Sequence, residues 1–428
     1  MGTAAIDTTI ERLGSCTTPT PLSRNEYITD NHRVLFHIDL QENIHCTDSV
    51  PQLPSFEAAG PRDTICFDPA TIACGIVTCG GLCPGLNDVI RAVVMSLFHH
   101  YGVKEIYGFR FGYEGLSSKH NHTPLELLPE NVNDIHNDGG TILGSSRGPQ
   151  DPSDMVDTLE KFNVKILFTI GGDGTLRGAQ KIAQEAQRRG NDIAVIGIPK
   201  TIDNDISCID QSFGFVTAVT EAHNAIYSAN MEAEGARNGI GLVKLMGRDS
   251  GFIAAFATLA NSEINYCLVP EVPFTLDGFL QALKRRIEKR GHAVIVVAEG
   301  AGQELLASGG SDASGNVLHG DIGIFLRDQI KAFSKKENLE INLKYIDPSY
   351  TIRSMPANSY DSVQCLLLGH NAVHAGMTGR TNMVVGYWKG RHIHVPISLA
   401  VAERKKIDPN GWLWSAVQES TGQPRKMI

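Results

Sequence analysis

From about residue 70 onward, the chain alternates between short apolar runs and longer segments with helical periodicity. The apolar runs are rich in β-branched residues, most end at or near Gly or Pro, and they cover residues 73–80, 164–172, 193–200, 239–247, 266–271, 293–300 and 381–388. Strands that are apolar on both faces and alternate with helices are typical of a parallel sheet covered on both sides. The pattern therefore predicts an α/β fold, in which ligands bind at the carboxyl ends of the strands.

The length and net charge of the chain limit its domain number and the classes of partner it can bind. A chain of 428 residues has room for about two domains, at roughly 100–200 residues each. The formal net charge of −9 argues against general binding of nucleic acids. No run approaches the ~18 apolar residues of a membrane-spanning helix, and the first residues lack the layout of a secretory signal. We therefore expect a cytoplasmic protein without a membrane partner.

The cysteines and the first 69 residues complete this outline. The chain has nine cysteines, and none of their spacings matches a zinc site, so we expect them to be reduced. Residues 1–69 carry clusters of Thr, Ser and Pro with little periodicity. We interpret them as an N-terminal extension that packs onto the body or onto a partner subunit, or is partly mobile.

Glycine-rich turns follow two of the apolar runs. The first run leads into T-C-G-G-L-C-P-G-L-N-D (78–88), where Gly80 and Gly81 allow a tight turn whose backbone N–H groups suit a phosphate. An ordinary strand–helix turn would need the same glycines. The run from 164 ends in G-G-D-G-T (171–175), where phosphates can approach the backbone and Asp173 can hold Mg²⁺. A plain turn aspartate is the alternative there.

Charged motifs follow two other runs. P-K-T-I-D-N-D (199–205) places Asp203 and Asp205 two residues apart with Lys200 close by, which suits proton removal from an alcohol during phosphoryl transfer. Helix capping by one of the carboxylates is the alternative. M-G-R-D-S-G (246–251) places Arg248 at a strand end, where it can clamp a phosphate or form a surface salt bridge.

In this order, the four motifs resemble one family, the 6-phosphofructokinases, from about residue 73 to 405. With L-G-S-S-R-G-P (143–149), they look like the long-chain ATP-dependent enzymes of protists, plants and some bacteria, which sit close to the pyrophosphate-dependent group. The resemblance implies two Rossmann-like three-layer domains with mostly parallel sheets and the active site in the cleft between them. The implied division is an N-terminal extension (1–69), a nucleotide-binding domain (70–214 with about 352–405) and a sugar-phosphate-binding domain (215–351 with about 406–428).

The resemblance also implies roles for individual residues. Asp203 would accept the proton of the 1-hydroxyl of fructose 6-phosphate, and Lys200, Arg147 and Asp205 would complete the catalytic set. ATP would be surrounded by Gly80, Gly81, Arg147, Gly148, Gly172, Asp173, Gly174, Thr175 and Gly178, with Asp173 holding Mg²⁺. Fructose 6-phosphate would contact Thr201, Ile202, Asp203, Met246, Gly247, Arg248, Glu299, Lys344, Tyr350 and Arg353. Some of these contacts cross subunits in the family, which implies a homo-oligomer, usually a tetramer.

At two positions this chain differs from the short bacterial enzymes of the family. The short bacterial enzymes carry Arg on the strand before M-G-R, where this chain has Gly239, and Gly where it has Lys200. We therefore expect Lys200 to be the basic residue that stabilises the transition state. Pyrophosphate users also carry Lys at that position, but they have Asp where this chain has Gly174, which favours ATP.

Three alternatives remain. They are a pyrophosphate-dependent phosphofructokinase, a kinase acting on NAD or a lipid, and a non-catalytic regulatory subunit. The charged motifs argue against the second, because such a kinase would not need both of them. The presence of both Asp203 and Asp173 argues against the third.

Overall fold

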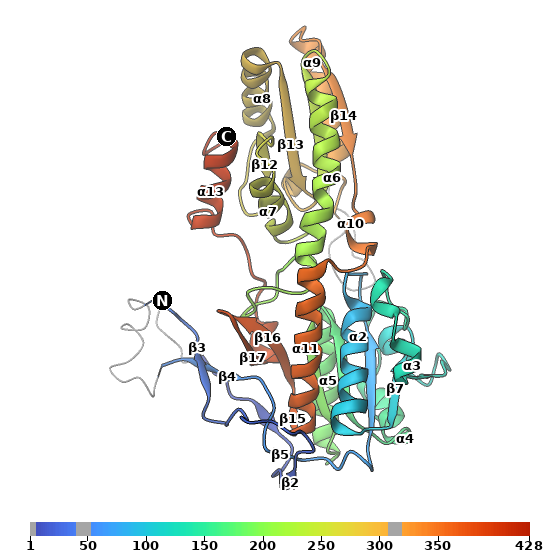
Figure 1. The fold of residues 1–428 in the computed structure, drawn as a ribbon. Helices are drawn as coiled ribbons and strands as arrows, with labels where there is room; N and C mark the ends of the chain where they lie inside the picture. The colour runs from blue at the N-terminus through green and yellow to red at the C-terminus, as the bar shows by residue number, and fades with distance from the viewer. Residues whose placement is uncertain (1–5, 40–52, 307–318) are drawn as a thin grey trace. The chain divides into compact units, whose positions relative to one another are not determined.

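The computed structural model describes residues 6–39, 53–306 and 319–428 (Figure 1). The chain divides into two compact units, each assembled from separate stretches. The first consists of Met1–Thr201, Ile206–Gly214 and Met355–Glu403, and the second of Ile202–Asp205, Phe215–Ser354 and Arg404–Ile428. Both units are built from helices packed on a sheet, so the predicted α/β class is confirmed.

A nine-stranded sheet forms the centre of the first unit, in the order β3-β4-β17-β16-β10-β9-β6-β7-β8. The strands are β3 (Arg33–Leu35), β4 (Ser55–Ala58), β6 (Ala73–Thr78), β7 (Glu105–Phe109), β8 (Leu125–Glu126), β9 (Val164–Gly171), β10 (Ala194–Pro199), β16 (Met383–Trp388) and β17 (Arg391–Pro396). The strands from β16 to β7 run parallel, whereas the strands at the two edges pair antiparallel.

Helices cover both faces of this sheet. The helices α2 (Leu86–Met95) and α11 (Ser359–Met377) lie side by side on one face, and α4 (Pro152–Lys161) packs with α5 (Asp173–Arg188) on the other (Figure 1). The shorter elements of the unit are η2 (Ser96–Tyr101), η3 (Gly112–Leu116), α3 (Pro129–Val132), η4 (Ile135–Asn137), α12 (Ile397–Ala400) and two small strand pairs, β1 (Glu11–Arg12) with β15 (Arg380–Thr381) and β2 (Thr18–Pro19) with β5 (Thr64–Ile65).

The segment before residue 70 is joined to this unit. Strands β3 and β4 extend the large sheet, and the carboxylate of Glu57 in β4 is buried among basic side chains. Its Oε1 atom lies 3.1 Å from Nη2 of Arg62 and 2.5 Å from Nε of Arg380, and it is 2.9 Å from Nδ1 of His394. The described residues of the N-terminal segment therefore pack onto the body of the first unit.

Cys16 and Cys66 form a disulfide bond within this segment. The expectation that the cysteines are reduced is therefore wrong for this pair. The pairing joins residues 50 positions apart, whose Cα atoms the fold brings to 4.1 Å, and such a distance cannot be obtained from sequence spacing. The other cysteines in the described part of the chain form no disulfide.

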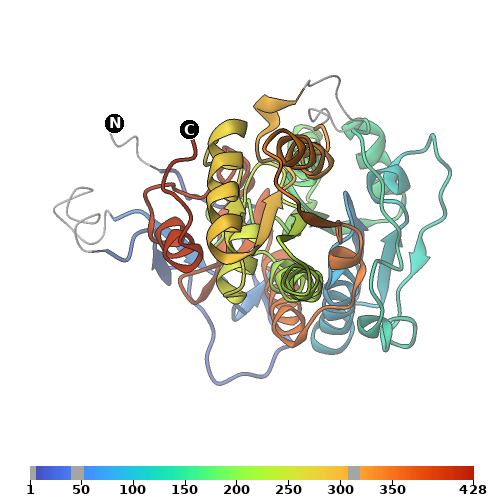
Figure 2. The same cartoon turned by 90° about the horizontal axis from the view of Figure 1, so that it is seen from above.

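The second unit contains a four-stranded parallel sheet in the order β12-β13-β11-β14. Its strands are β11 (Gly239–Leu245), β12 (Tyr266–Leu268), β13 (His292–Ala298) and β14 (Asn342–Ile346), and its helices are α6 (Phe215–Glu234), α7 (Phe252–Ala260), α8 (Leu276–Arg290), α9 (Ile322–Lys336), α10 (Thr351–Ser354) and α13 (Trp412–Thr421), with the short helix η5 (Gln303–Leu305). Figure 2 shows α6 and α9 on opposite sides of these strands.

Close packing of α6 on β11 explains one departure from the short bacterial template. A Cβ atom added at Gly239 would lie 2.0 Å from the carbonyl oxygen of Ala233 on α6. No side chain fits there, so an Arg at this position would require α6 to lie farther from the sheet.

Every apolar run predicted as a strand contains one. Among the longer strands, β7, β14 and β17 were not predicted, because polar residues or Gly interrupt their apolar pattern. The short strands β1 to β5 and β8 were not predicted either. Among the helices of the described residues, none has the length and apolar character needed to cross a membrane.

Candidate active site

Three neighbouring strands of the first unit end at the same edge of its sheet. The register pairs Thr78 of β6 with Ile170 of β9, and Gly171 of β9 with Pro199 of β10. The residues that follow these strands are therefore brought together at the edge where parallel sheets bind ligands. They include the glycine turn at 80–81, the turn at 172–175 and Lys200.

Lys200 is buried and reaches the first glycine turn. Its Nζ atom donates a hydrogen bond to the carbonyl oxygen of Gly81 at 2.5 Å. The backbone of Gly80 has a φ angle of +85°, and a Cβ added there would lie 3.3 Å from Lys200 Nζ. Glycine at position 80 thus satisfies both the left-handed turn and the close approach of the ammonium group.

The predicted loop 143–149 contacts the same turn. The N–H of Gly80 donates to the carbonyl oxygen of Ser146 at 3.1 Å, and the hydroxyl of Ser145 donates to the carbonyl oxygen of Gly80 at 2.6 Å. Arg147 follows with an exposed side chain, and Gly148 has a φ angle of +108°. Arg147 and Gly148 are therefore next to the first glycine turn.

The second glycine turn begins helix α5. Gly172 caps the helix, and the carboxylate of Asp173 in its first turn is half-buried and lies 3.2 Å from Nε of Arg177. Around Gly174, no atom of the described residues lies within 4 Å of where a Cβ would stand, and this position is exposed. The backbone at Gly174 is therefore open to a ligand.

Thr175 and Gly178 face inward instead. Thr175 is buried, and its carbonyl oxygen accepts a hydrogen bond from the hydroxyl of Tyr113 at 2.6 Å. A Cβ at Gly178 would lie 2.4 Å from the ring of Tyr113. Packing against Tyr113 is therefore sufficient to explain the glycine at 178, and its predicted contact with the nucleotide stays a prediction.

Strands β11 and β13 of the second unit also end side by side, because Leu245 pairs with Ala298. The N–H of Glu299 donates to the carbonyl oxygen of Leu245 at 2.9 Å, and the N–H of Gly300 donates to that of Gly247 at 3.0 Å. Gly247 has a φ angle of +123°. The segment Met246–Gly247–Arg248 and Glu299 are therefore held together at one edge of the sheet.

Glu299 lies in a field of mixed charge. Burial raises the pKa of its carboxyl, while the positive charges of Lys244, Arg248 and Arg353 act in the opposite direction. The guanidinium carbon of Arg353 also lies 5.0 Å from the centre of the Tyr350 ring, and this ring is largely exposed. Four of the predicted sugar-phosphate residues, Arg248, Glu299, Tyr350 and Arg353, thus form one neighbourhood.

Lys344 stands apart from this neighbourhood. It pairs with Gly241, four residues before the end of β11, which corresponds to about 13 Å along a strand. Its Nζ atom lies 3.7 Å from Oε2 of Glu232 on α6. Within this unit the structure does not bring Lys344 to the strand ends, and its role stays a prediction.

Asp203 lies in a cluster of acidic groups of the second unit. Burial raises the pKa of Asp203 well above its ordinary value, and the negative charges of Asp205, Glu299 and Asp249 act in the same direction. The positive charge of Arg404 partly opposes them. A carboxyl with such a pKa binds a proton more readily than an exposed aspartate does, as proton transfer requires.

The backbone around Asp203 changes environment within a few residues. Thr201, which accepts a hydrogen bond from the hydroxyl of Ser212 at 2.6 Å, belongs to the first unit. Ile202 is buried and belongs to the second. Asp205 is buried as well, and its carbonyl oxygen accepts a hydrogen bond from the N–H of Lys405 at 2.8 Å.

The structure adds charged residues that were not predicted from the sequence. Arg404 pairs with Asp249 and lies 3.5 Å from Asp205. Lys244 Nζ lies 2.8 Å from carboxylate oxygens of both Asp321 and Asp347. Two of these residues could have been found from the sequence, because Asp249 lies within M-G-R-D-S-G and Lys244 stands two residues before Met246. No sequence pattern connects Arg404 to this cluster.

The two units offer the two kinds of group that phosphoryl transfer to an alcohol needs. The first has glycine turns with a buried lysine at parallel strand ends. The second has two carboxyl groups whose pKa is raised by burial, Asp203 and Glu299, and arginines whose positive charges act on both. Phosphate positioning, charge neutralisation and proton removal are the elements of that reaction. The chain thus has the features of a phosphotransferase.

Comparisons with known proteins specify the class further. The phosphofructokinase family profile matches residues 73–376. The ATP-dependent 6-phosphofructokinase of Amycolatopsis methanolica is 50% identical over 98% of this chain and 95% of its own. The enzyme of the same name from Borreliella burgdorferi is 46% identical, over 99% of this chain and 98% of its own.

Solved structures agree at the level of the fold. The pyrophosphate-dependent phosphofructokinase from Marinobacter aquaeolei matches with a TM-score of 0.68 at 19% identity, over 83% of this chain and 96% of that one. The chain belongs to the phosphofructokinase family, as its motifs predicted.

Proposed function

We propose that the chain transfers the γ-phosphoryl group of ATP to the 1-hydroxyl of fructose 6-phosphate, producing fructose 1,6-bisphosphate and ADP, a step of glycolysis. The observation that carries the proposal is the pKa of Asp203, which burial and neighbouring carboxylates raise. Two relatives that match the chain over nearly its full length are named ATP-dependent 6-phosphofructokinases.

Asp203 acts as the general base. It takes the proton of the 1-hydroxyl as the oxygen attacks the γ-phosphorus, and a raised pKa strengthens it as a proton acceptor. The negative charge of Asp205 supports this role, because it favours the neutral form that Asp203 reaches when it accepts the proton.

Lys200 and Arg147 supply positive charge to the transferring group. Lys200 already points its ammonium group at the first glycine turn, where it donates to Gly81. Arg147 follows Ser146, which accepts from the N–H of Gly80. Cations positioned where charge builds up lower the barrier of phosphoryl transfer.

The nucleotide lies along the glycine turns, against Gly80, Gly81, Gly148, Gly172 and Gly174, with Thr175 and Gly178 behind them. Asp173 fits Mg²⁺, since its half-buried carboxylate offers a hard oxygen ligand next to the turn. The bound ion would supply charge neutralisation at the donor phosphates. Asp173 would leave Arg177 to take up this role.

Arg248 and Arg353 bind the 6-phosphate, and Glu299 accepts a hydrogen bond from a sugar hydroxyl. The proximity of both arginines to Glu299 supports this assignment. Thr201, Ile202, Met246, Gly247, Tyr350 and Lys344 complete the proposed set of substrate contacts.

The chain forms a homo-oligomer, for which a tetramer is the proposed state. The outer side of α11 exposes apolar side chains, namely Tyr360, Val363, Leu366 and Leu367. An exposed row of this kind on one helix suits contact with another copy. Light scattering of the purified protein measures the state directly.

The cytoplasm is the proposed location, because it holds both ATP and sugar phosphates. The Cys16–Cys66 disulfide is of a kind more common in oxidising compartments. Cell fractionation followed by thiol labelling of this pair would test both points at once.

A coupled assay tests the proposed reaction. Purified protein is given fructose 6-phosphate and Mg²⁺ with either ATP or pyrophosphate, and formation of fructose 1,6-bisphosphate is followed. Turnover with ATP that exceeds turnover with pyrophosphate supports the proposal. The reverse order supports the pyrophosphate-dependent alternative, and absence of both supports the regulatory one.

A further inference from the structure

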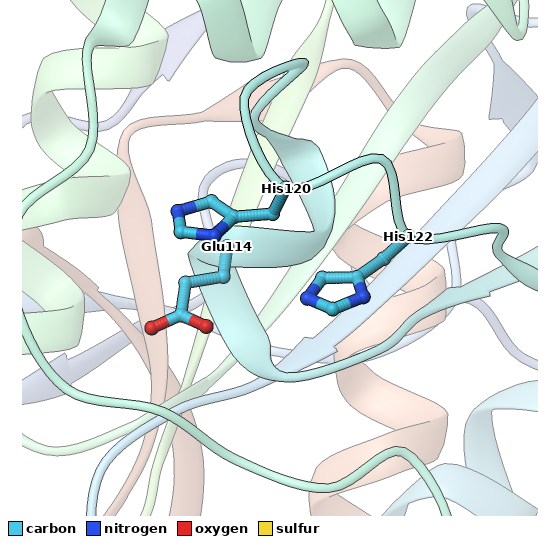
Figure 3. A group of neighbouring side chains, drawn as sticks. All are labelled: Glu114, His120 and His122. Atoms are coloured by element: carbon cyan, nitrogen blue, oxygen red, sulfur yellow. The ribbon is translucent and has the colours of Figure 1, made fainter.

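Two histidines and a glutamate of the first unit gather in the segment that follows β7. Glu114, His120 and His122 each offer one ligand atom, and these atoms all lie within 4.8 Å of one another. Figure 3 shows the three side chains grouped around a common space. We propose that they bind one transition-metal ion, for which Zn²⁺ is the best match, at a site separate from the one proposed for Mg²⁺.

The local fold holds these residues in place. Glu114 lies in the short helix η3, and the chain after it is fixed to α4 by the carboxylate of Asp154. This carboxylate accepts from the hydroxyl of Ser117 at 2.7 Å and from the N–H of Ser118 at 3.0 Å. The group is therefore built on an anchored loop rather than on a free end.

The two histidines are oriented by the residue between them. Asn121 has a φ angle of +51°, a conformation that Asn adopts more readily than most residues. The imidazole rings of His120 and His122 are parallel within 4°, with their centres 5.9 Å apart. The aligned rings place a nitrogen of each on the side of Glu114.

The three groups are available as ligands. Within the described part of the chain, neither the carboxylate of Glu114 nor the two imidazoles make a hydrogen bond or an ion pair. Tetrahedral zinc with nitrogen and oxygen ligands at about 2.0–2.1 Å needs them about 3.3 Å apart. Small side-chain rotations bring atoms within 4.8 Å to that separation, and a water molecule would take the fourth position.

The chemistry of the ligands selects the metal. Imidazole nitrogen suits Zn²⁺, Ni²⁺ and Cu²⁺, whereas Mg²⁺ prefers oxygen and keeps much of its water. Asp173, a carboxylate beside a phosphate turn, offers oxygen and therefore suits Mg²⁺. The two sites should therefore bind different ions in the same solution.

The site is attached to the surroundings of the first glycine turn. The ring of Phe111 lies 4.8 Å from that of His122, centre to centre, and the carbonyl oxygen of Phe111 accepts from the hydroxyl of Ser146. A metal ion bound here would thus stiffen the segment that supports the loop 143–149.

Calorimetric titration of the full chain with Zn²⁺ tests the proposal, after chelator treatment and in excess Mg²⁺. One ion per chain should bind, and His120→Ala/His122→Ala should weaken that event by on the order of 100-fold, while Glu114→Gln weakens it less. The matched control is His32→Ala/His99→Ala, which removes two other exposed histidines and should leave binding unchanged. Equal binding by both double variants, or no binding by the wild type, overturns the proposal.

X-ray absorption of the zinc-loaded wild type gives a readout that does not depend on the stability of any variant. A shell of nitrogen and oxygen at about 2.0–2.1 Å with imidazole scattering is expected. A shell containing sulfur at about 2.3 Å would assign the ion to cysteines and overturn the proposal.

Discussion

Arg404 places its Nη1 atom 3.5 Å from Oδ2 of Asp205. The same guanidinium pairs with Asp249, and its positive charge lowers the pKa of Asp203 against the upward effect of burial and of the neighbouring carboxylates. Arg404 therefore limits how far the pKa of the proposed general base rises.

Replacement of this arginine should move the pH profile. In Arg404→Gln the pKa of Asp203 rises further, so the base is protonated at a higher pH. The acidic limb of kcat/KM should shift upward by about 1 pH unit. A pH–rate profile measures it, and Lys406→Gln, which removes an exposed charge nearby in the chain, should leave the limb in place. A shift to lower pH would contradict the charge assignment.

Asp203→Asn should remove the base while retaining the shape of the side chain. We expect kcat to fall on the order of 10²–10⁴-fold, with little change in the KM for fructose 6-phosphate. Steady-state kinetics at saturating ATP checks this. A kcat within a few-fold of wild type would exclude Asp203 as the proton acceptor.

The same variant should be more stable than the wild type at high pH. The folded pKa of Asp203 is raised above its unfolded value of about 3.9, so its ionisation opposes folding as the pH rises through the folded pKa. Asparagine lacks this effect. Urea unfolding should therefore show a gain at pH 8 that shrinks toward pH 4, whereas Asp192→Asn at an exposed position should show none.

How much could be predicted from the sequence depends on how local the signal is. The strands β6, β9, β10, β11 and β13 are continuous apolar runs, and the residues after them were found because the carboxyl ends of parallel strands meet at one edge. Arg404 was missed because only the tertiary fold brings it beside Asp205, about 200 positions away in the sequence.

The edge strands, including those of the N-terminal segment, were missed for a similar reason. Strands β3 and β4 are short and have no apolar periodicity of their own. They are held by β17 and by the buried charge network of Glu57, which joins residues from four separate parts of the chain. Such pairing depends on partners that no local pattern identifies.

Glu57→Gln should destabilise the first unit strongly. Burial would raise the pKa of Glu57, but His394 and Arg380 hold it well below its usual range, so the carboxylate is ionised. Its loss leaves buried cations without their counter-charge, at a cost of about 3–5 kcal/mol. Urea unfolding measures this, with Glu126→Gln on the exposed strand β8 as the control. Equal stabilities would show that the network contributes little.

Arg353→Ala and Arg248→Ala should weaken binding of the sugar phosphate. A charge-assisted phosphate contact contributes about 1.5–3 kcal/mol, so the KM for fructose 6-phosphate should rise by roughly 10- to 150-fold while the KM for ATP barely changes. Lys344→Ala tests whether Lys344 contacts the substrate. A rise in the KM for fructose 6-phosphate supports the predicted contact, whereas an unchanged KM indicates that Lys344 only pairs with Glu232.

The choice of phosphoryl donor should depend on Gly174. A Cβ added there meets no described atom within 4 Å, so Gly174→Asp can be accommodated without disturbing helix α5, in whose first turn it lies. The new carboxylate would occupy the space and repeat the charge of an α-phosphate, and like charges in a poorly solvated site repel by several kcal/mol. Turnover with ATP should therefore fall by more than about 100-fold.

The control variant Gly174→Asn has a side chain of equal size without the charge. It separates the steric from the electrostatic effect and should retain more ATP turnover than Gly174→Asp. Because Lys200 can neutralise the transferring group whatever the leaving group, any turnover of Gly174→Asp with pyrophosphate should exceed that of the wild type. Undiminished ATP turnover in Gly174→Asp would place the nucleotide elsewhere than along this turn.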